Sequence, residues 1–465
     1  MSKTVAPLHC IVLAAGQGTR MKSALPKVLH PLAGQPMLAH VLGAARGLSA
    51  AGIHIVYGHG GEQVRSWFER SRQPGAGVSW AEQREQLGTA HAVQQAMPAV
   101  PDDAVVLVLY GDVPMISAPT LQALLEAGRR TLAVLTVEVD DPTGYGRIVR
   151  KAGAISAIVE EKEASARQKA IREINTGFMA APARRLRGWL KKVRNDNAKG
   201  EYYLTDIVAL AVKDKLKVAT VSASDAAEVE GVNDRLQLAR AERAVQLRQA
   251  QALLRDGVAL ADPARLDVRG VLTHGRDVFI DVGCVFEGEV ALGDGVRIGP
   301  YCIVRTATIG AGTVVEAHSV IDNATVGARC QIGPFTRLRP EADLADEVHI
   351  GNFVEVKKVK LGQRSKANHL AYLGDGEVGA DVNIGAGTIF CNYDGANKHR
   401  TVIEDGVHIG SDTQLVAPVT VGRNATVGAG STIARDVPAG GLTICRAREQ
   451  KTYPGWKRPQ KKPKG

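Results

Sequence analysis

The chain contains 465 residues, of which 45% are hydrophobic and 23% charged, and its formal net charge is +10. This length predicts two or three domains, and no apolar run is long enough to cross a bilayer as a helix. Residues 446–465 hold eight Lys or Arg and one Glu, so a basic tail explains most of the net charge and a nucleic-acid-binding body is not required. The six cysteines form no C-x-x-C pair and the start lacks a signal-peptide pattern, so we expect a cytoplasmic protein with no nucleic-acid or membrane partner.

Residues 1–232 form the first predicted domain, in which strand patterns alternate with helical patterns. Apolar runs predict buried strands at residues 9–15, 53–57, 104–110 and 132–139. Helical patterns lie between them at residues 36–48, 90–96 and 118–129. Such alternation predicts an α/β domain with a parallel sheet that is covered by helices on both faces.

The loop after the first strand carries residues suited to binding phosphate. It reads Leu13-Ala14-Ala15-Gly16-Gln17-Gly18-Thr19-Arg20-Met21, and Pro26-Lys27 follows. The two glycines allow backbone N–H groups to approach phosphate oxygens closely. Arg20 and Lys27 can neutralise a triphosphate and the pyrophosphate that leaves it.

A second candidate element, Tyr110-Gly111-Asp112, ends another predicted strand. Ligands bind at the carboxyl ends of strands in open α/β sheets. Mg²⁺ usually takes one or two oxygen ligands from the protein and the rest from phosphate and water. The Asp112 carboxylate is therefore a candidate Mg²⁺ ligand.

Residues 233–256 are rich in Ala, Leu, Arg, Gln and Glu and contain no Gly or Pro, which predicts one long connecting helix. From residue 257 to 465 we expect a second domain, in which aliphatic residues recur every six positions. A period of six fits a triangular coil with a short strand on each side, an inward aliphatic residue on each strand and a Gly-x corner. We call these inward residues the hexad ladder: Ile280, Phe286, Leu292, Ile298, Ile309, Val315, Ile321, Val326, Ile332, Leu338, Leu344, Ile350, Val356, Val378, Ile384, Phe390, Ile403, Ile409, Leu415, Val421, Val427 and Ile433. The phase is interrupted at residues 362–377, which predicts a locally specialised surface.

Both halves resemble known families. The L-A-A-G-x-G-T-R-M string with its downstream P-K resembles the signature of sugar-1-phosphate nucleotidyltransferases, and the hexad ladder resembles the left-handed parallel β-helix of hexapeptide acyltransferases. Nearly the whole chain resembles the bacterial family of bifunctional N-acetylglucosamine-1-phosphate uridyltransferases/glucosamine-1-phosphate acetyltransferases. The fold that this implies is a Rossmann-like nucleotidyltransferase domain and a left-handed β-helix, joined by a long helix.

In the first domain the resemblance implies uridylyl transfer from UTP to N-acetylglucosamine-1-phosphate, with Mg²⁺ bound by Asp112 and Asn233. Arg20 and Lys27 would be the catalytic cations. The substrate contacts implied by the family also include Leu13, Ala14, Ala15, Gly16, Lys27, Tyr110 and Gly111. Gln83 and the stretch from Gln86 to Ala90, which holds Gly88 and Thr89, resemble the family's base-reading segment. Gly146, Glu160 and Asn175 match its sugar-binding positions.

In the second domain, polar residues crowd into the repeats between Arg337 and Asp394. Acetyl transfer to an amine needs a base, and His369 suits this because its pKa lies near neutrality. Arg339 and Lys357 can bind the phosphate of glucosamine-1-phosphate, and Tyr372 and Asn383 can orient its sugar. The resemblance implies a homotrimer in which acetyl-CoA contacts Ala386, Asn392, Tyr393, Ser411, Ala429 and Arg446. Asn368 stands where we expect a small residue.

Three other functions are compatible with parts of the sequence. The β-helix can be a scaffold for a single nucleotidyltransferase activity, but the set Arg339, Lys357, His369 and Tyr372 argues against it. The chain can be a non-catalytic subunit, but Lys27, Asp112 and Asn233 argue against that. A nucleic-acid-binding role rests only on the basic tail.

Overall fold

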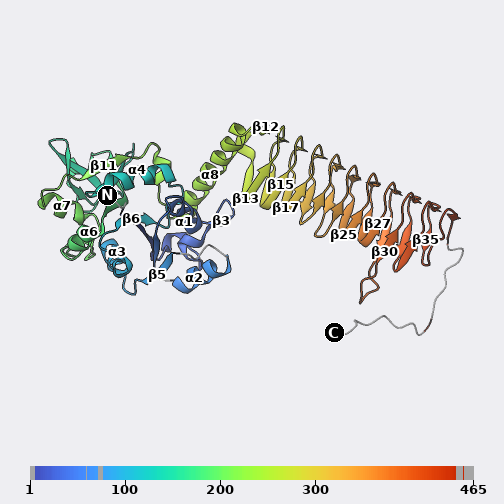
Figure 1. Cartoon of the computed structure of the whole chain (residues 1–465), viewed down its shortest axis with the longest axis horizontal. Helices are drawn as coiled ribbons and strands as arrows, with labels where there is room; N and C mark the ends of the chain where they lie inside the picture. The colour runs from blue at the N-terminus through green and yellow to red at the C-terminus, as the bar shows by residue number, and fades with distance from the viewer. Residues whose placement is uncertain (1–5, 59, 72–76, 447–453, 455–465) are drawn as a thin grey trace, which may run out of the picture. The chain divides into compact units, whose positions relative to one another are not determined.

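The computed structural model describes residues 6–58, 60–71, 77–446 and 454 (Figure 1). The chain divides into two compact units, Met1–Val245 and Gln246–Gly465. The basic tail, except Arg446 and Pro454, lies outside the described residues. None of the described helices combines the length and the hydropathy that a membrane crossing requires.

The first unit is built on a nine-stranded sheet with the strand order β11-β7-β10-β6-β1-β4-β5, to which β8 and β9 are added beside β10. The strands of the path are β11 (Ala219–Ser222), β7 (Ala133–Glu138), β10 (Glu173–Pro182), β6 (Val105–Tyr110), β1 (Leu8–Ala14), β4 (Gly52–Tyr57) and β5 (Val78–Glu82). Strand β1 is parallel to both β4 and β6. The four strands expected from the sequence are therefore confirmed as β1, β4, β6 and β7.

Helices cover the two faces of this sheet with separate cores. Successive residues of β1 alternate between them, since Cys10 and Val12 belong to one core and Ile11 and Leu13 to the other. The first core also contains residues of α1 (Met37–Gly47), α2 (Gly61–Arg70) and α4 (Ala118–Gly128). The second contains residues of α3 (Thr89–Ala96), α6 (Ala183–Leu190) and α7 (Asp206–Lys213). The three helices expected from the sequence are confirmed as α1, α3 and α4.

The sheet is mixed, so the expectation of a purely parallel sheet was wrong. Strand β10 runs antiparallel to both β6 and β7. The reason is its connection: β10 follows the hairpin of β8 (Arg147–Lys151) and β9 (Ala154–Val159) and the one-turn helix α5 (Ala166–Lys169), in place of a crossover helix. The hairpin pairs with β10 at Ile174 and Arg147, and this places it beside the candidate sugar-binding residues.

The helix α8 (Arg235–Arg255) occupies the segment in which one long helix was predicted. The division between the two compact units falls within it, between Val245 and Gln246. Val245 packs with Leu32 and Met37 in the first unit, while Ala250 belongs to the core of the second. Each half of the helix is therefore held by its own unit.

The second unit is a parallel β-helix whose short strands stack rung upon rung (Figure 1). One sheet contains β12 (Ala259–Leu260), β14 (Phe279–Ile280), β16 (Arg297–Ile298), β18 (Val314–Val315), β21 (Gln331–Ile332), β24 (His349–Asn352), β26 (Lys366–His369), β28 (Asn383–Ile384), β31 (His408–Ile409), β34 (Thr426–Val427) and β36 (Leu442–Thr443). The other contains β13 (Asp267–His274), β15 (Val285–Leu292), β17 (Ile303–Ile309), β19 (Val320–Asp322), β20 (Thr325–Val326), β22 (Arg337–Leu338), β23 (Asp343–Leu344), β25 (Glu355–Leu361), β27 (Tyr372–Val378), β29 (Ile389–Cys391), β30 (Thr401–Ile403), β32 (Gln414–Val416), β33 (Val419–Val421) and β35 (Thr432–Ile433). The first sheet runs as one path along the whole coil.

The hexad ladder is confirmed as the core of this coil, because every one of its members is at most 4% exposed. Rungs contain 18 or 17 residues: Ile280 pairs with Ile298, and Ile298 pairs with Val315. The interruption expected at residues 362–377 does not exist as a break in the coil. Ala367 and Leu373 point into the same core there, and Ala367 is too small to be recognised as a ladder residue.

Many corners of the coil are not glycine, contrary to the Gly-x expectation. Tyr301, His318, Phe335 and Phe353 all have φ between 56° and 60°. A left-handed conformation costs a non-glycine residue about 1 kcal/mol. The rings of these four residues stack with centroid distances of 4.9–5.3 Å, and this contact between rungs offsets the backbone cost.

Candidate active sites

Two adjoining cavities lie at the carboxyl ends of β1 and β6 in the first unit. One, of about 280 Å³, is lined by residues 13–16, Lys27, Gln83, Gly88 and Thr89. The other, of about 310 Å³, is lined by Arg20, Thr143, Gly144, Tyr145 and Asn233. Tyr110 and Asp112 line both cavities, so these two residues mark the point where the cavities meet. Ligands of α/β sheets bind at this edge.

The Gly-rich loop is shaped so that Lys27 can lie against it. Gly18 has a φ of +62°, and a Cβ at this position would lie 2.6 Å from the Cβ of Lys27. Any larger residue would therefore displace the 3₁₀ turn at Lys27–Leu29 that carries the lysine. Gly18 therefore allows Lys27 to lie close to the loop, and it also leaves backbone N–H groups exposed.

The Lys27 ammonium lies between the two predicted metal ligands. It forms an ion pair with the Asp112 carboxylate and donates a hydrogen bond of 3.1 Å to the Asn233 side-chain oxygen. The Lys27 and Asp112 side chains are 13% and 19% exposed, which strengthens the pairing relative to a surface contact. The backbone N–H of Val232 donates to the Asp112 carbonyl at 2.8 Å and fixes the two segments together. The Asp112 and Asn233 oxygens thus converge on one cation, and hard oxygen donors of this kind suit Mg²⁺.

One end of the first cavity is fixed by hydrogen bonds among the residues predicted to read the base. Gln83 is buried, and its Nε2 donates to the Gly88 carbonyl at 3.1 Å. Gln86 Nε2 donates to the Ala15 carbonyl at 2.7 Å, and Thr89 Oγ1 accepts a bond from the backbone N–H of Leu204. The structure therefore brings these residues together through hydrogen bonds.

Two of the predicted sugar-binding residues are sequence neighbours of residues that line the second cavity, since Gly146 follows Tyr145 and Asn175 precedes Thr176. The Asn175 N–H donates to the Gly146 carbonyl at 2.8 Å, and Glu160 Oε1 accepts a bond from the Thr205 hydroxyl at 3.1 Å. Burial raises the pKa of Tyr110, and the carboxylates of Asp112 and Glu160 raise it further. Tyr110 therefore stays a neutral phenol between the cation site and the sugar residues.

In the second unit, a cationic cluster forms on β25 and its neighbours. Arg339 Nη1 pairs with Glu355 Oε1 at 2.6 Å, and Lys357 lies two residues after Glu355, on the same side of the strand. The Lys398 side chain approaches Lys357 and lowers the pKa of Lys357, and Arg339 acts in the same direction. Three cations held this close create a site that favours a phosphate dianion.

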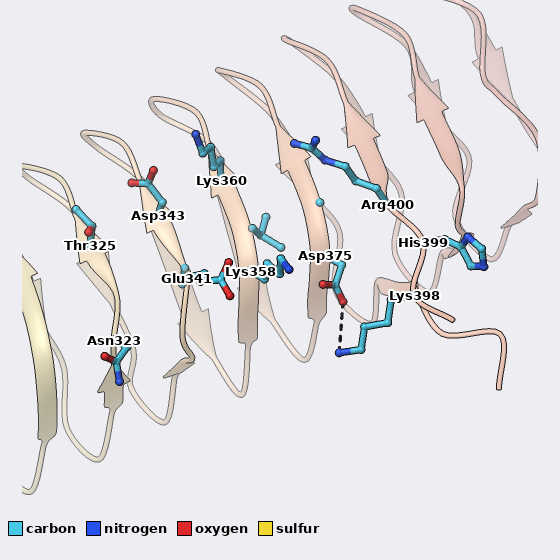
Figure 2. Close-up of a pocket in the computed structure, with 13 residues that line it drawn as sticks. Asn323, Thr325, Glu341, Asp343, Lys358, Lys360, Asp375, Lys398, His399 and Arg400 are labelled. Carbon is cyan, nitrogen blue, oxygen red and sulfur yellow. Dashed lines mark ion pairs between the residues drawn. The ribbon is translucent and has the colours of Figure 1, made fainter. Parts of the chain in front are cut away.

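Lys398 and Asp375 are site residues that the sequence reasoning did not single out. The Lys398 ammonium lies 3.9 Å from Asp375 Oδ2 (Figure 2). Asn392 Nδ2 donates a hydrogen bond to the same oxygen. Asn392 Nδ2 also lies 3.5 Å from the Tyr372 hydroxyl. Residues 392–400 interrupt the six-residue repeat, and Lys398 lies among them. This interruption was the one feature of the sequence that indicated Lys398.

Residues 392–400 project from the coil between β29 and β30, and the Asp394 side chain holds their conformation. Asp394 accepts bonds from the backbone N–H groups of Ala396 and Asn397 and pairs with His399 at 2.7 Å. These bonds, led by that from Asn397, hold the pKa of Asp394 well below its usual range. The turn is therefore preformed, and it places Lys398 beside the cationic cluster.

A cavity of about 640 Å³ opens beside this cluster on the face of β23, β25 and β27. Figure 2 shows its lining side chains, with Asp375 and Lys398 facing each other at one end. Lys358, Lys360 and Arg400 add positive charge, while Glu341 and Asp343 add negative charge. The cavity is continuous with the predicted phosphate-binding residues through Asp375 and Lys398.

Four of the six predicted acetyl-CoA contacts, Ala386, Ser411, Ala429 and Arg446, form a column along the coil, while Asn392 and Tyr393 lie on the projecting segment. The N–H of Gly387, next to Ala386, donates to the carbonyl of exposed His369 at 3.4 Å, and the Asp412 N–H donates to the Ala386 carbonyl at 2.7 Å. The column continues through Ser411, whose carbonyl accepts from Gly430, and ends where Arg446 Nη2 donates to the Ala429 carbonyl at 2.7 Å. His369 therefore stands at one end of a continuous row of predicted cofactor contacts.

Not every predicted residue joins one site within a single chain. Asn383 belongs to β28 and pairs with Lys366, on a different sheet from the one that carries Lys357 and Tyr372. Tyr393 is 60% exposed, and its hydroxyl donates to the Gly395 carbonyl within its own turn. Asn368 is half-buried, and its Oδ1 has no hydrogen-bond partner among the described residues.

Known domain families and relatives match nearly the whole chain. The MobA-like NTP transferase domain matches residues 10–176, the GMPPB C-terminal domain 268–369, and the bacterial transferase hexapeptide (six repeats) 400–435. Proteins named "Bifunctional protein GlmU" from Azoarcus sp. (strain BH72), Alkalilimnicola ehrlichii and Chromobacterium violaceum are 59%, 56% and 56% identical over 98% of this chain. The matches cover 100%, 97% and 99% of those proteins. The chain belongs to the bifunctional GlmU family.

This membership confirms the family resemblance that was predicted from the sequence. The protein is a bifunctional transferase with a Rossmann-like nucleotidyltransferase domain and a left-handed parallel β-helix of hexapeptide repeats. A one-activity enzyme and a non-catalytic scaffold are both excluded by it. The individual site residues remain predictions, which the geometry described above supports to different degrees.

Proposed function

We propose that the two domains catalyse consecutive steps in the synthesis of UDP-N-acetylglucosamine. The β-helix domain transfers an acetyl group from acetyl-CoA to glucosamine-1-phosphate. The nucleotidyltransferase domain then transfers a uridylyl group from UTP to N-acetylglucosamine-1-phosphate and releases pyrophosphate. The observation that carries the proposal is the convergence of the Asp112 and Asn233 oxygens on one cation at the junction of two cavities.

In the first domain we assign binding and charge neutralisation to this chain's residues. Gln83 and Gly88 hold the uracil end, Gly146, Glu160 and Asn175 hold the sugar, and Arg20 and Lys27 balance the phosphate charge. The sugar phosphate oxygen attacks the α-phosphorus of UTP, the bond to the β-phosphate oxygen breaks, and pyrophosphate leaves. Mg²⁺ held by Asp112 and Asn233 supplies further neutralisation of the phosphates.

In this assignment Asp112 and Asn233 would hold the metal ion through their side-chain oxygens. The Lys27 ammonium, which lies within reach of both side chains, would share in neutralising the triphosphate. Its ion pair with Asp112 keeps that carboxylate from being an unpaired charge in a largely buried site.

In the second domain we assign His369 as the general base. His369 removes a proton from the amine of glucosamine-1-phosphate, the amine nitrogen attacks the thioester carbonyl of acetyl-CoA, and the carbon–sulfur bond breaks to release CoA as a thiol after it takes up a proton. Arg339, Lys357 and Lys398 bind the sugar phosphate. Tyr372 and Asn383 orient the sugar, and the column from Ala386 to Arg446 binds the cofactor.

We further propose that the protein is a cytoplasmic homotrimer. The separation of Asn383 from the cationic cluster within one chain supports this, because a second copy of the chain is needed to complete one site from both sheets. The exposed Tyr393 on a projecting turn is suited to reach a neighbouring copy.

Release of free thiol from acetyl-CoA tests the acetyl-transfer half of the proposal. The wild-type protein and a His369→Ala variant are each mixed with acetyl-CoA and glucosamine-1-phosphate, without UTP. Thiol release by the wild type that collapses in the variant supports the acetyltransferase and its base. No release by the wild type would reduce the β-helix to a scaffold and leave only uridylyl transfer.

A further inference from the structure

We propose that Arg147 is a positioning residue for the sugar phosphate in uridylyl transfer, acting through the wall of the second cavity rather than by contact with substrate. The proposal rests on the function proposed above, and it concerns a residue to which no part of that mechanism assigns a role. Arg147 begins β8 and directly follows Gly146, one of the predicted sugar contacts.

The Arg147 side chain is a buried charge that is 2% exposed. Its Nη2 pairs with Glu161 Oε2 at 2.7 Å, and its Nη1 donates to the Tyr145 carbonyl. A weaker bond of 3.4 Å reaches the Lys169 carbonyl, and Nε has no partner among the described residues. Burying a guanidinium in this way is costly, and a fully structural pair would be expected to satisfy every donor.

The contacts of Arg147 join the segments that form the cavity wall. Tyr145, whose carbonyl it binds, lines the cavity together with Gly144. Glu161 accepts a bond from the Gly144 N–H at 3.4 Å and directly follows the predicted sugar contact Glu160. One ion pair between Arg147 and Glu161 therefore holds both the 143–146 loop and the end of β9.

Backbone contacts connect Arg147 to the third predicted sugar contact, Asn175. Arg147 pairs with Ile174 across the β8–β10 register, and the neighbouring Asn175 N–H donates to the Gly146 carbonyl at 2.8 Å. Each predicted sugar contact is therefore a sequence neighbour of this network. Gly146 precedes Arg147 itself, and Glu160 precedes its ion-pair partner Glu161. Asn175 follows Ile174, with which Arg147 pairs across the sheet. The first cavity, with Gln83 and Gly88, has no such connection among the described contacts.

A matched control lies three residues further along the same strand. Arg150 forms an ion pair with Glu173 at 2.6 Å and also ties β8 to β10, but neither residue lines either of the two cavities described above. Both arginines thus contribute ion pairs to one hairpin. They differ in burial, since Arg150 is 34% exposed, and in their relation to the sugar-binding segments.

The test measures kcat and KM for both uridyltransferase substrates in Arg147→Lys, Glu161→Gln and Arg150→Lys. Lysine keeps the charge but cannot form the forked contacts of arginine. We expect KM for N-acetylglucosamine-1-phosphate to rise about tenfold in Arg147→Lys and less in Glu161→Gln, with KM for UTP unchanged. Arg150→Lys is expected to change neither KM.

Two results would overturn the inference. One is a wild-type KM for the sugar phosphate in both Arg147→Lys and Glu161→Gln. The other is an equal rise in both KM values, which indicates general loosening of the domain. If Arg147→Lys does not fold, Glu161→Gln decides, because that carboxylate is 28% exposed and glutamine keeps a side-chain oxygen that can accept a hydrogen bond from Arg147. A wild type that forms no UDP-sugar would instead contradict the proposed function.

Discussion

Lys27 and Asp112 form an ion pair although 85 positions separate them in the sequence. Each follows a different strand of the sheet, Lys27 after β1 and Asp112 after β6, and these two strands are neighbours. The pairing of the strands therefore brings a cation and a carboxylate to one edge, where Asn233 adds a second oxygen. The Asp112 carboxylate at this junction lines both cavities.

Replacing Asp112 by Asn tests its role at this junction. The change keeps the size of the side chain but removes the negative charge that a divalent cation needs. We expect uridylyl transfer to fall by about 100-fold or more and to require more Mg²⁺, measured as pyrophosphate release over a Mg²⁺ titration. Glu228→Gln alters a buried carboxylate bound to Ser117 and Thr120 and is the stability control. An unchanged Mg²⁺ dependence in Asp112→Asn would contradict the assignment.

A His369→Gln variant tests the base of acetyl transfer with a smaller change in side-chain size than His369→Ala. Loss of general base catalysis should lower the rate of thiol release by about 100-fold to 10,000-fold. His349 is a suitable control, because it lies one rung earlier on the same sheet, near Lys366 and His369. His349→Gln is expected to retain activity. Equal losses in the two variants would show that the corner, and not the His369 imidazole, matters.

Asp375→Asn tests how the projecting segment is held over the cationic cluster. The amide cannot balance the Lys398 charge and weakens the bond from Asn392. We expect KM for glucosamine-1-phosphate in acetyl transfer to rise about threefold to tenfold, with a smaller change in kcat. Asp381→Asn breaks an exposed pair with Arg364 on the same coil and should leave both constants unchanged. A fall in kcat alone would count against this role.

The stability of the first domain should depend on pH through His54. This buried ring bonds to His9 and Ser79, and burial lowers its pKa to about 4, with His9 acting in the same direction. Because the folded-state pKa lies below the unfolded value of 6.5, the stabilisation is complete above pH 6.5 and is lost as the pH falls towards 4. At pH 5 the loss should be about 2 kcal/mol.

Thermal unfolding at pH 8 and pH 5 measures this effect. His54→Gln removes the titrating group, so the Tm of the first domain should change less with pH in the variant than in the wild type. His40, whose Nε2 donates a hydrogen bond to the Leu32 carbonyl in the same domain, provides a control as His40→Gln. Equal pH dependence in the wild type and His54→Gln would refute the argument.

Periodic features of this molecule could be predicted from the sequence, and features that depend on distant contacts could not. The hexad ladder repeats a large aliphatic residue at a fixed spacing, so both its period and its burial were predictable. At Ala367 the period persists but the side chain is small, and the phase therefore looked interrupted. The direction of β10 depends on a hairpin connection that local propensity does not encode.

The candidate sites divide in the same way. Lys27, Asp112 and His369 lie in short motifs whose chemistry is visible in the residues themselves. The partners of Arg147 and the position of Lys398 are set by strand register and by a projecting turn, so no local pattern indicates them. The separation of Asn383 from the cationic cluster is likewise a property of the coil and not of the motif.

The two active sites of this chain are proposed to work independently, and one comparison of variants tests this directly. Wild type, Asp112→Asn and His369→Gln are each given acetyl-CoA, glucosamine-1-phosphate and UTP while free thiol and UDP-N-acetylglucosamine are followed together. We predict that Asp112→Asn releases thiol at the wild-type rate but forms almost no nucleotide sugar. His369→Gln should form nucleotide sugar at the wild-type rate only when N-acetylglucosamine-1-phosphate is supplied. A loss of thiol release in Asp112→Asn, or a failure of His369→Gln to form nucleotide sugar from supplied N-acetylglucosamine-1-phosphate, would contradict two independent sites.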